Sequence, residues 1–256
     1  MKYTVLSLFP EIIDVYFSSS IMARAVAAGL VEYRSINIRD YAFDRHRTCD
    51  DAPYGGGAGM LMLAEPLGRA LEAAGAERGP GRGDGKRVIY LSPSGRPFTQ
   101  EWARELAACD ELILLCGRYE GIDQRIVDRY VDAELSVGDY VLSSGEVAAL
   151  TVIDATYRLV QEVITPESLE EESFSGGLLE YPQYTRPEIY DTLRVPEVLL
   201  SGHHENIRRW RLEKRVEKTL NLRPDLIRRG GELGLFDAET RKVIEERCME
   251  QRGEGE

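Results

Sequence analysis

A glycine-rich segment with charged residues just before it is the first group that could do chemistry. The run Tyr54-Gly55-Gly56-Gly57-Ala58-Gly59-Met60 would expose several backbone amides, and Arg45-His46-Arg47 precedes it with Asp50 and Asp51 between them. Such a mixture suits contact with an RNA backbone and placement of a base. Because the run contains no lysine and follows no clear strand, it does not match a nucleotide phosphate loop. A flexible loop without a ligand is the alternative.

An arginine and several acids near the middle of the chain could carry acid–base chemistry. Asp154, Arg158 and Glu162 are spaced four apart, so they would share one face of a helix. The same spacing makes an exposed ladder of ion pairs, each of which stabilises a helix by roughly 0.3 kcal/mol. The acids from Glu170 to Glu172 follow, and such runs are more typical of a solvated linker. Residue types alone leave both alternatives open.

A strip of basic residues lies inside an otherwise acidic chain. Between His203 and Arg229, lysine and arginine outnumber the acids, although the net charge of the whole chain is −12. On an amphipathic helix, with Trp210 and Leu212 interleaved, this strip could hold an RNA backbone. The candidate contacts are Arg208, Arg209, Arg211, Lys214 and Arg215. A solvated helix face is the alternative.

Composition excludes several classes of protein. The chain has 256 residues, of which 43% are hydrophobic and 30% charged, so wholesale disorder is excluded. No apolar stretch approaches the ~18–20 residues of a membrane span, and the first residues lack a cleavage pattern. The four cysteines form no C-x-x-C pair and indicate free thiols in a reducing compartment. We therefore expect a cytoplasmic protein with no membrane partner.

Strands alternate with helices in the first part of the chain. Apolar, β-rich runs predict strands at 3–8, 31–38, 88–91 and 112–116, and helical patterning predicts helices at 11–17, 21–28, 99–107, 122–130 and 146–160. This alternation predicts an α/β domain with a mostly parallel sheet that is covered on both faces. From Glu162 to Glu180 the chain has acids but no lysine or arginine, which predicts a linker. From Pro187 onward the pattern is helical without a convincing strand.

Several motifs in a fixed order are similar to those of one family. They are Ser7-Leu8-Phe9-Pro10-Glu11, Asp44-Arg45-His46-Arg47-Thr48, Pro53-Tyr54-Gly55-Gly56-Gly57, Tyr90-Leu91-Ser92-Pro93, Cys116-Gly117-Arg118-Tyr119-Glu120-Gly121, Gly138-Asp139-Tyr140-Val141-Leu142-Ser143, Tyr184-Thr185-Arg186-Pro187 and Leu200-Ser201-Gly202-His203. Over nearly the whole chain, this order resembles the bacterial tRNA (guanine-N1)-methyltransferase family, TrmD, of the SPOUT superfamily.

The resemblance implies the organisation of the molecule. Residues 1–161 would form a parallel-sheet domain of the SPOUT type with a deep trefoil knot, which is a rare exception to the rule against threaded chains. Residues 162–177 would be a flexible acidic linker that acts as a lid, and residues 178–256 a small helical domain that binds tRNA. The resemblance also implies a homodimer in which the partner chain completes each active site.

The resemblance also places S-adenosylmethionine on three loops. Glycines and small residues there would let backbone groups approach an adenine edge closely. The implied cofactor residues are Tyr90, Leu91, Ser92, Pro93, Gly95, Gly117, Tyr119, Glu120, Gly121, Ser136, Val137, Gly138, Tyr140, Leu142, Ser144, Gly145 and Ala148. The family pattern has a glycine and a proline where this chain has Ser144 and Ala148, so we expect a reshaped cofactor loop.

The implied reaction methylates N1 of the guanosine just 3′ of the anticodon, which maintains the reading frame. Guanine N1 holds a proton at neutral pH, so the reaction needs a general base at N1 and a cation near O6. By resemblance the base is Glu172 and the cation is Arg158. The family has aspartate at the position of Glu172, so Glu171 is an alternative base. Magnesium dependence is also implied, with Glu120 and Glu172 as candidate ligands, although no spacing marks a metal site.

The resemblance assigns the remaining site residues to the anticodon stem-loop of tRNA. They are Arg45, His46, Asp50, Tyr54, Gly55, Gly56, Gly57, Gly59, Arg186, Arg208, Arg209, Arg211, Lys214 and Arg215. Two alternatives remain from other functional classes. One is a related SPOUT enzyme that methylates a ribose 2′-hydroxyl, and the other is an RNA-binding scaffold without catalytic activity.

Overall fold

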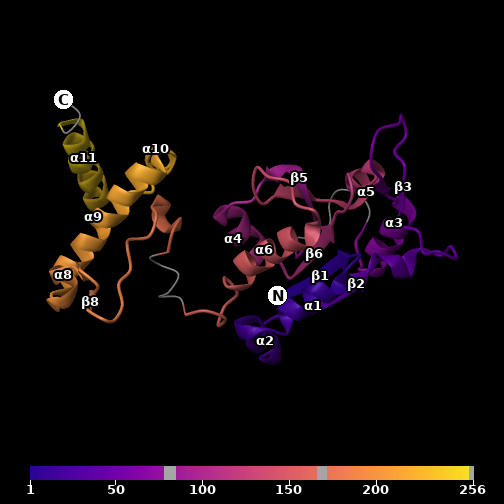
Figure 1. Cartoon of the computed structure of the whole chain (residues 1–256), viewed down its shortest axis with the longest axis horizontal. Helices are drawn as coiled ribbons and strands as arrows, with labels where there is room; N and C mark the ends of the chain where they lie inside the picture. The colour runs from indigo at the N-terminus through magenta and orange to yellow at the C-terminus, as the bar shows by residue number, and fades with distance from the viewer. Residues whose placement is uncertain (78–84, 166–171, 254–256) are drawn as a thin grey trace. The chain divides into compact units, whose positions relative to one another are not determined.

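The computed structural model describes residues 1–77, 85–165 and 172–253. Contacts divide the chain into two compact units, Met1–Ile164 and Thr165–Glu256, which are coloured indigo to rose and orange to yellow in Figure 1. The boundary between them falls within the predicted linker 162–177. Residues 166–171 of that linker, which include the alternative base Glu171, lie outside the described residues.

A five-stranded parallel sheet forms the centre of the first unit, as the sequence pattern predicted. The strand order is β2-β1-β6-β5-β7, and every pair of neighbours is parallel. The strands are β1 (Lys2–Ser7), β2 (Glu32–Asn37), β5 (Lys86–Pro97), β6 (Glu111–Cys116) and β7 (Ala133–Ser136). The short strand β7 was not predicted. All residues of the central strand β6 are buried, because helices cover both faces of the sheet.

The two faces of the sheet pack into two separate cores. Leu112, Leu114 and Cys116 point into one core, whereas Ile113 and Leu115 point into the other, as the alternation of a strand requires. Helices on the first face are α1 (Pro10–Phe17), α2 (Ser20–Ala27), α4 (Gln100–Ala107) and α6 (Gly145–Tyr157), and those on the second are η1 (Ile38–Tyr41), α3 (Ala64–Ala73) and α5 (Gln124–Tyr130).

Local sequence signals explain where several of these helices begin. Pro10 occupies the first turn of α1, where its missing N–H costs nothing. The Thr99 hydroxyl accepts a hydrogen bond from the Trp102 N–H and so caps α4, as the sequence predicted. Helix α3 was not predicted, although Leu67, Ala70 and Leu71 are buried at helical spacing. Two short antiparallel strands, β3 (Asp50–Asp51) and β4 (Leu61–Met62), flank the glycine-rich segment.

The second unit is mostly helical and has its own small core. Leu178, Val216, Phe236 and Val243 are buried together. Its elements are η2 (Ser175–Gly177), β8 (Ile189–Tyr190), β9 (Leu193–Arg194), α8 (Glu197–Leu200), α9 (His204–Leu222), α10 (Pro224–Glu232) and α11 (Ala238–Gly253). The expectation of no strand beyond Pro187 was wrong. Strands β8 and β9 form an antiparallel hairpin of two residues each, which is too short to show a period in sequence.

Over the described ranges, no helix is both long enough and apolar enough to cross a membrane. The four cysteines are free thiols, as expected from their spacing, and Cys49 and Cys116 are buried.

A buried carboxylate joins the amino ends of three strands at the sheet edge. Glu111 accepts hydrogen bonds from the Thr4 hydroxyl at 2.8 Å and pairs with Lys2 at 3.0 Å and Lys86 at 3.1 Å. Burial opposes its ionisation, but the hydrogen bonds from Thr4, Lys2 and Lys86 outweigh burial and lower the pKa of Glu111. The ionised carboxylate of Glu111 therefore stabilises the folded state.

Replacement of Glu111 by glutamine is expected to lower the free energy of unfolding at neutral pH by about 1–3 kcal/mol. Because the pKa is lower in the folded than in the unfolded chain, this stabilisation is lost as the pH falls through the folded-state value. The difference between the two proteins should therefore shrink below about pH 4. Urea unfolding across pH measures it. Glu32→Gln, an exposed change on β2, is the control and should stay within about 0.5 kcal/mol.

Candidate active site

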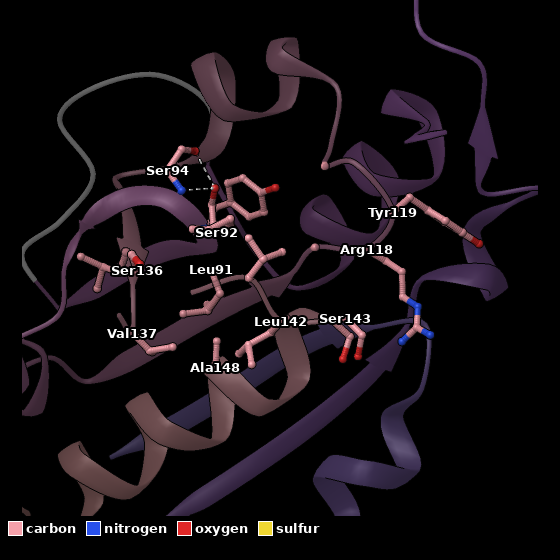
Figure 2. Close-up of a pocket in the computed structure, with 18 of the residues that line it drawn as sticks. Leu91, Ser92, Ser94, Arg118, Tyr119, Ser136, Val137, Leu142, Ser143 and Ala148 are labelled. Carbon is pink, nitrogen blue, oxygen red and sulfur yellow. Dashed lines mark hydrogen bonds between the residues drawn. The ribbon is translucent and has the colours of Figure 1, made fainter. Parts of the chain in front are cut away.

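A pocket of about 400 Å³ opens at the edge of the sheet where β5, β6 and β7 lead into loops. Strand β5 bulges between Leu91 and Arg96, and the other two loops follow Cys116 and Ser136 directly. Parallel strands end at the same edge, so these loops meet there, as ligand sites of open α/β sheets do. Figure 2 shows Leu91, Val137, Leu142 and Ala148 converging on the apolar part of the pocket.

This pocket collects most of the cofactor residues that the resemblance implied. Every one of them lines it except Gly95 and Gly138. The lining residues that the resemblance did not name individually are Ser94, Arg118, Leu135, Val141 and Ser143, of which only Leu135 lies outside the three loops it assigned to the cofactor. All five are adjacent in sequence to implied residues, and Arg118 stands between Gly117 and Tyr119. Its guanidinium lies 4.6 Å from the centre of the Phe9 ring, a contact that the linear motif could not reveal.

Close approaches of the backbone explain why three loop positions are glycine. The Gly145 N–H donates to the Gly117 carbonyl at 2.8 Å, and a Cβ on Gly145 would lie 2.7 Å from the Cys116 Cα. Helix α6 therefore starts directly against the loop after β6. Gly95 and Gly138 do not line the pocket, but a Cβ on Gly95 would meet the backbone of β7, and one on Gly138 the Tyr140 ring.

The two departures from the family pattern fit the backbone that the structure shows. Ser144 is extended, with a φ of −164°, so this position does not require glycine. Its side chain makes no capping hydrogen bond to α6. Ala148 lies in the first turns of α6, is 7% exposed and lines the pocket.

Two titratable side chains, Tyr90 of β5 in the pocket and the buried Cys116 at the end of β6, stay neutral. Burial raises the pKa of the Tyr90 phenol, and a hydrogen bond with Ser92 only partly opposes this effect. Burial also raises the pKa of the Cys116 thiol, and the nearby Glu146 carboxylate adds to that shift. A neutral buried thiol is a poor nucleophile, so Cys116 is not suited to covalent catalysis.

The segment from Arg45 to Gly59, which the resemblance assigns to RNA, lies in the first unit beside the loop after β6. Asp44 accepts hydrogen bonds from the His46 and Thr48 backbone and from the Thr48 hydroxyl, which holds the preceding turn in shape. The backbone bond from Thr48 is the largest cause of the lowered pKa of Asp44. Tyr54 is 99% exposed.

Backbone hydrogen bonds then connect this segment to the loop after β6. The Glu120 N–H donates to the Met60 carbonyl at 3.0 Å, and the Met62 N–H donates to the Gly121 carbonyl at 3.0 Å. The structure therefore brings the glycine-rich segment and one implied cofactor loop together.

The two implied catalytic residues belong to different units. Arg158 is half-buried at the carboxyl end of α6 in the first unit, whereas Glu172 is half-buried at the start of the described part of the second. Their pairing at one site therefore stays a prediction. On the same helix as Arg158, Asp154 accepts a hydrogen bond from Tyr16 and so joins α6 to α1. Across the described residues, no group of three His, Cys, Asp or Glu side chains could hold a metal ion.

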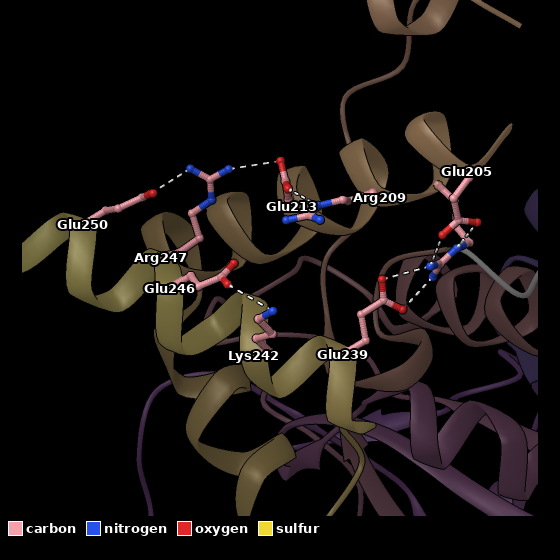
Figure 3. A network of polar contacts seen from close by, with 9 residues as sticks. Glu205, Arg209, Glu213, Glu239, Lys242, Glu246, Arg247 and Glu250 are labelled. Atoms are coloured by element: carbon pink, nitrogen blue, oxygen red, sulfur yellow. Dashed lines mark hydrogen bonds and ion pairs between the residues drawn. The ribbon is translucent and has the colours of Figure 1, made fainter. Parts of the chain in front are cut away.

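The five candidate contacts of the basic strip lie on α9, where they contact other residues of the second unit. Arg208 pairs with Glu205 and Glu239, each at 2.8 Å, and Arg209 pairs with Glu213 at 3.0 Å (Figure 3). Arg215 donates to the Ser175 and Leu179 carbonyls. Arg211 lies over the Tyr181 ring, and Lys214 pairs with Glu217. Arg208 and Arg209 are exposed, so an RNA phosphate would have to compete with their carboxylate partners.

Comparison with known proteins agrees with the motif order. The model of the family "tRNA (Guanine-1)-methyltransferase TrmD" matches residues 1–229. A tRNA (guanine-N(1)-)-methyltransferase of Treponema denticola is 59% identical over 246 residues, which cover 96% of this chain and 98% of the relative. The proteins of the same name from Treponema pallidum (54% identical; 96% of each chain) and Borrelia duttonii (57% identical; 88% of this chain and 92% of the relative) are also similar. The chain therefore belongs to the tRNA (guanine-1)-methyltransferase TrmD family.

Proposed function

We propose that this protein transfers the methyl group of S-adenosylmethionine to N1 of the guanosine just 3′ of the anticodon of tRNA, in the cytoplasm. The observation that carries the proposal is the match to relatives named tRNA (guanine-N(1)-)-methyltransferase over 96% of the chain. The pocket at the edge of the sheet supplies the physical support, since its lining agrees with the motifs that the family resemblance assigned to the cofactor.

The pocket fits the cofactor in size and in chemistry. Its volume of about 400 Å³ lies in the range of ligand sites, and it combines apolar side chains with exposed backbone groups of three loops. We assign the adenine and ribose to the apolar part near Leu91, Val137 and Ala148. When bound, S-adenosylmethionine supplies an electrophilic methyl group on a sulfonium.

Two side chains then act on the guanine. The carboxylate of Glu172 takes the proton from N1 while the N1 lone pair forms the new bond to the methyl carbon, and the carbon–sulfur bond breaks toward sulfur. Arg158 stabilises the negative charge that develops on O6. The products are N1-methylguanosine in tRNA and S-adenosylhomocysteine.

The remaining organisation follows the family. We assign a trefoil knot and cofactor binding to residues 1–161, a closing lid to 162–177, and binding of the anticodon stem to 178–256. A homodimer would complete each site, and exposed apolar side chains on the adjoining helices α1 (Ile12, Val15) and α6 (Val147) support an interface there.

Methyl transfer from labelled S-adenosylmethionine to an unmodified tRNA transcript with guanosine after the anticodon tests this function. Nucleoside analysis of the product should show N1-methylguanosine. A 2′-O-methylated nucleoside would instead identify a ribose methyltransferase, and cofactor binding without transfer to any tRNA would identify a scaffold. A transcript with adenosine at the target position is the matched control and should accept no methyl group.

A further inference from the structure

Gly59 touches a side chain of the pocket. It has a φ of +87°, and a Cβ built on it would lie 2.4 Å from Cγ and 2.6 Å from Oε1 of Glu120. The stem of Glu120 therefore lies directly on the Gly59 backbone, and any larger residue at this position would require the Glu120 side chain to move. Glu120 itself lines the pocket at the edge of the sheet.

The next residue along the loop reaches the same segment. Burial and the neighbouring Asp50 carboxylate in β3 raise the pKa of the Tyr119 phenol, and Arg39 partly opposes this shift, so Asp50 and Arg39 both lie close to the phenol. Figure 2 shows the Tyr119 side chain extending away from the apolar part of the pocket. Together with the backbone bond from Glu120 N–H to the Met60 carbonyl, three contacts tie adjacent residues of the pocket loop to the glycine-rich segment.

Other glycines of the segment make no such contact. Gly56 has nearly the same backbone conformation, with a φ of +79°, but nothing lies within 4 Å of a Cβ there. Gly57 would meet only Pro53 Cγ, at 3.9 Å. The close contact is thus particular to Gly59, and it is not a general property of the segment.

We propose that Gly59 is a positioning residue that acts through Glu120, so that the cofactor pocket and the glycine-rich segment hold one another in shape. The inference rests on the proposed function, which places S-adenosylmethionine in the pocket, and on the family resemblance, which assigns RNA to the glycine-rich segment. Coupling of this kind is reciprocal: a cofactor that holds Glu120 strengthens RNA binding at the segment, and RNA strengthens cofactor binding by the same factor.

Replacement of Gly59 by alanine tests the coupling in the complete chain without any RNA. The added methyl group must displace Glu120, so the dissociation constant of S-adenosylhomocysteine, measured by calorimetry, should rise about five- to tenfold. Gly56→Ala imposes the same backbone strain without the overlap and should change that constant less than about twofold. Equal effects of the two changes would overturn the proposal. Failure of the wild-type protein to bind the ligand would instead count against the proposed function.

Removal of the Glu120 side chain should cancel the effect of Gly59→Ala on the binding of S-adenosylhomocysteine. In a Glu120→Ala background, Gly59→Ala should weaken ligand binding less than about twofold. Hydrogen exchange of the ligand-free proteins gives a readout that does not depend on affinity. Gly59→Ala should speed exchange at residues 117–121, whereas Gly56→Ala should not. In the Glu120→Ala background, adding Gly59→Ala should no longer change exchange at these residues. An unchanged effect of Gly59→Ala in the Glu120→Ala background would contradict the proposed route.

Discussion

Methyl transfer is expected to fall by about a hundredfold or more when Glu172 is replaced by glutamine, while the cofactor still binds. Glutamine preserves the size of the side chain but cannot accept the proton of N1, and a positioned general base contributes about 10²–10⁴-fold to such a step. Single-turnover kinetics with saturating tRNA and cofactor measure the chemical step itself. Calorimetric titration with S-adenosylhomocysteine should give an unchanged dissociation constant.

A charge change elsewhere in the second unit is the control for this experiment. Glu232→Gln removes one exposed carboxylate from α10, where it pairs with Arg228 at 3.8 Å, and should leave the single-turnover rate within about twofold. If Glu172→Gln retains full activity, the enzyme assignment stands and another acid takes the proton. Glu172→Asp, which restores the residue type of the family pattern, should keep most of the activity if the loop adjusts to the shorter side chain.

The second large effect is expected at Gly145. An alanine there would place its methyl group 2.7 Å from both the Cys116 Cα and the Gly117 nitrogen, and these backbone atoms cannot rotate away. The start of α6 must then move away from the loop after β6, and the hydrogen bond between Gly145 and Gly117 is lost. A misplacement of about 1 Å in such a site costs on the order of a hundredfold in rate. We therefore expect a loss of that order in methyl transfer, together with weaker binding of S-adenosylmethionine.

Another helical glycine of the same unit separates this effect from a general intolerance of alanine. A Cβ on Gly68 in α3 would meet Ile126 Cδ1 at 3.6 Å, which is an ordinary contact. Gly68→Ala should therefore leave cofactor affinity unchanged, and thermal unfolding of both variants checks that they fold. Equal cofactor affinity in the Gly145→Ala protein and the wild type would show that the close approach of α6 to Gly117 does not shape the pocket.

Sequence patterns were sufficient to predict the central sheet and most of its helices, because the apolar residues of each element recur at the spacing of a strand or a helix. The apolar run Leu112 to Cys116 and the helical spacing after Thr99 each report burial within a few neighbouring residues, and both elements were placed correctly. Strand β7 and the β8–β9 hairpin were missed since elements of four and two residues are too short to show a period. Helix α3 showed the period and was missed nonetheless.

The motif order by itself determined the family and the three loops that the pocket brings together. What the linear sequence could not contain is which backbone atoms those loops bring into contact. The need for glycine at Gly145 arises from Cys116 and Gly117, and the need at Gly59 arises from Glu120. Arg118 stands in a loop that the resemblance assigned to the cofactor, but its contact with the Phe9 ring exists only in the folded chain. Such requirements depend on distances between segments that are remote in sequence, and only the tertiary structure decides those distances.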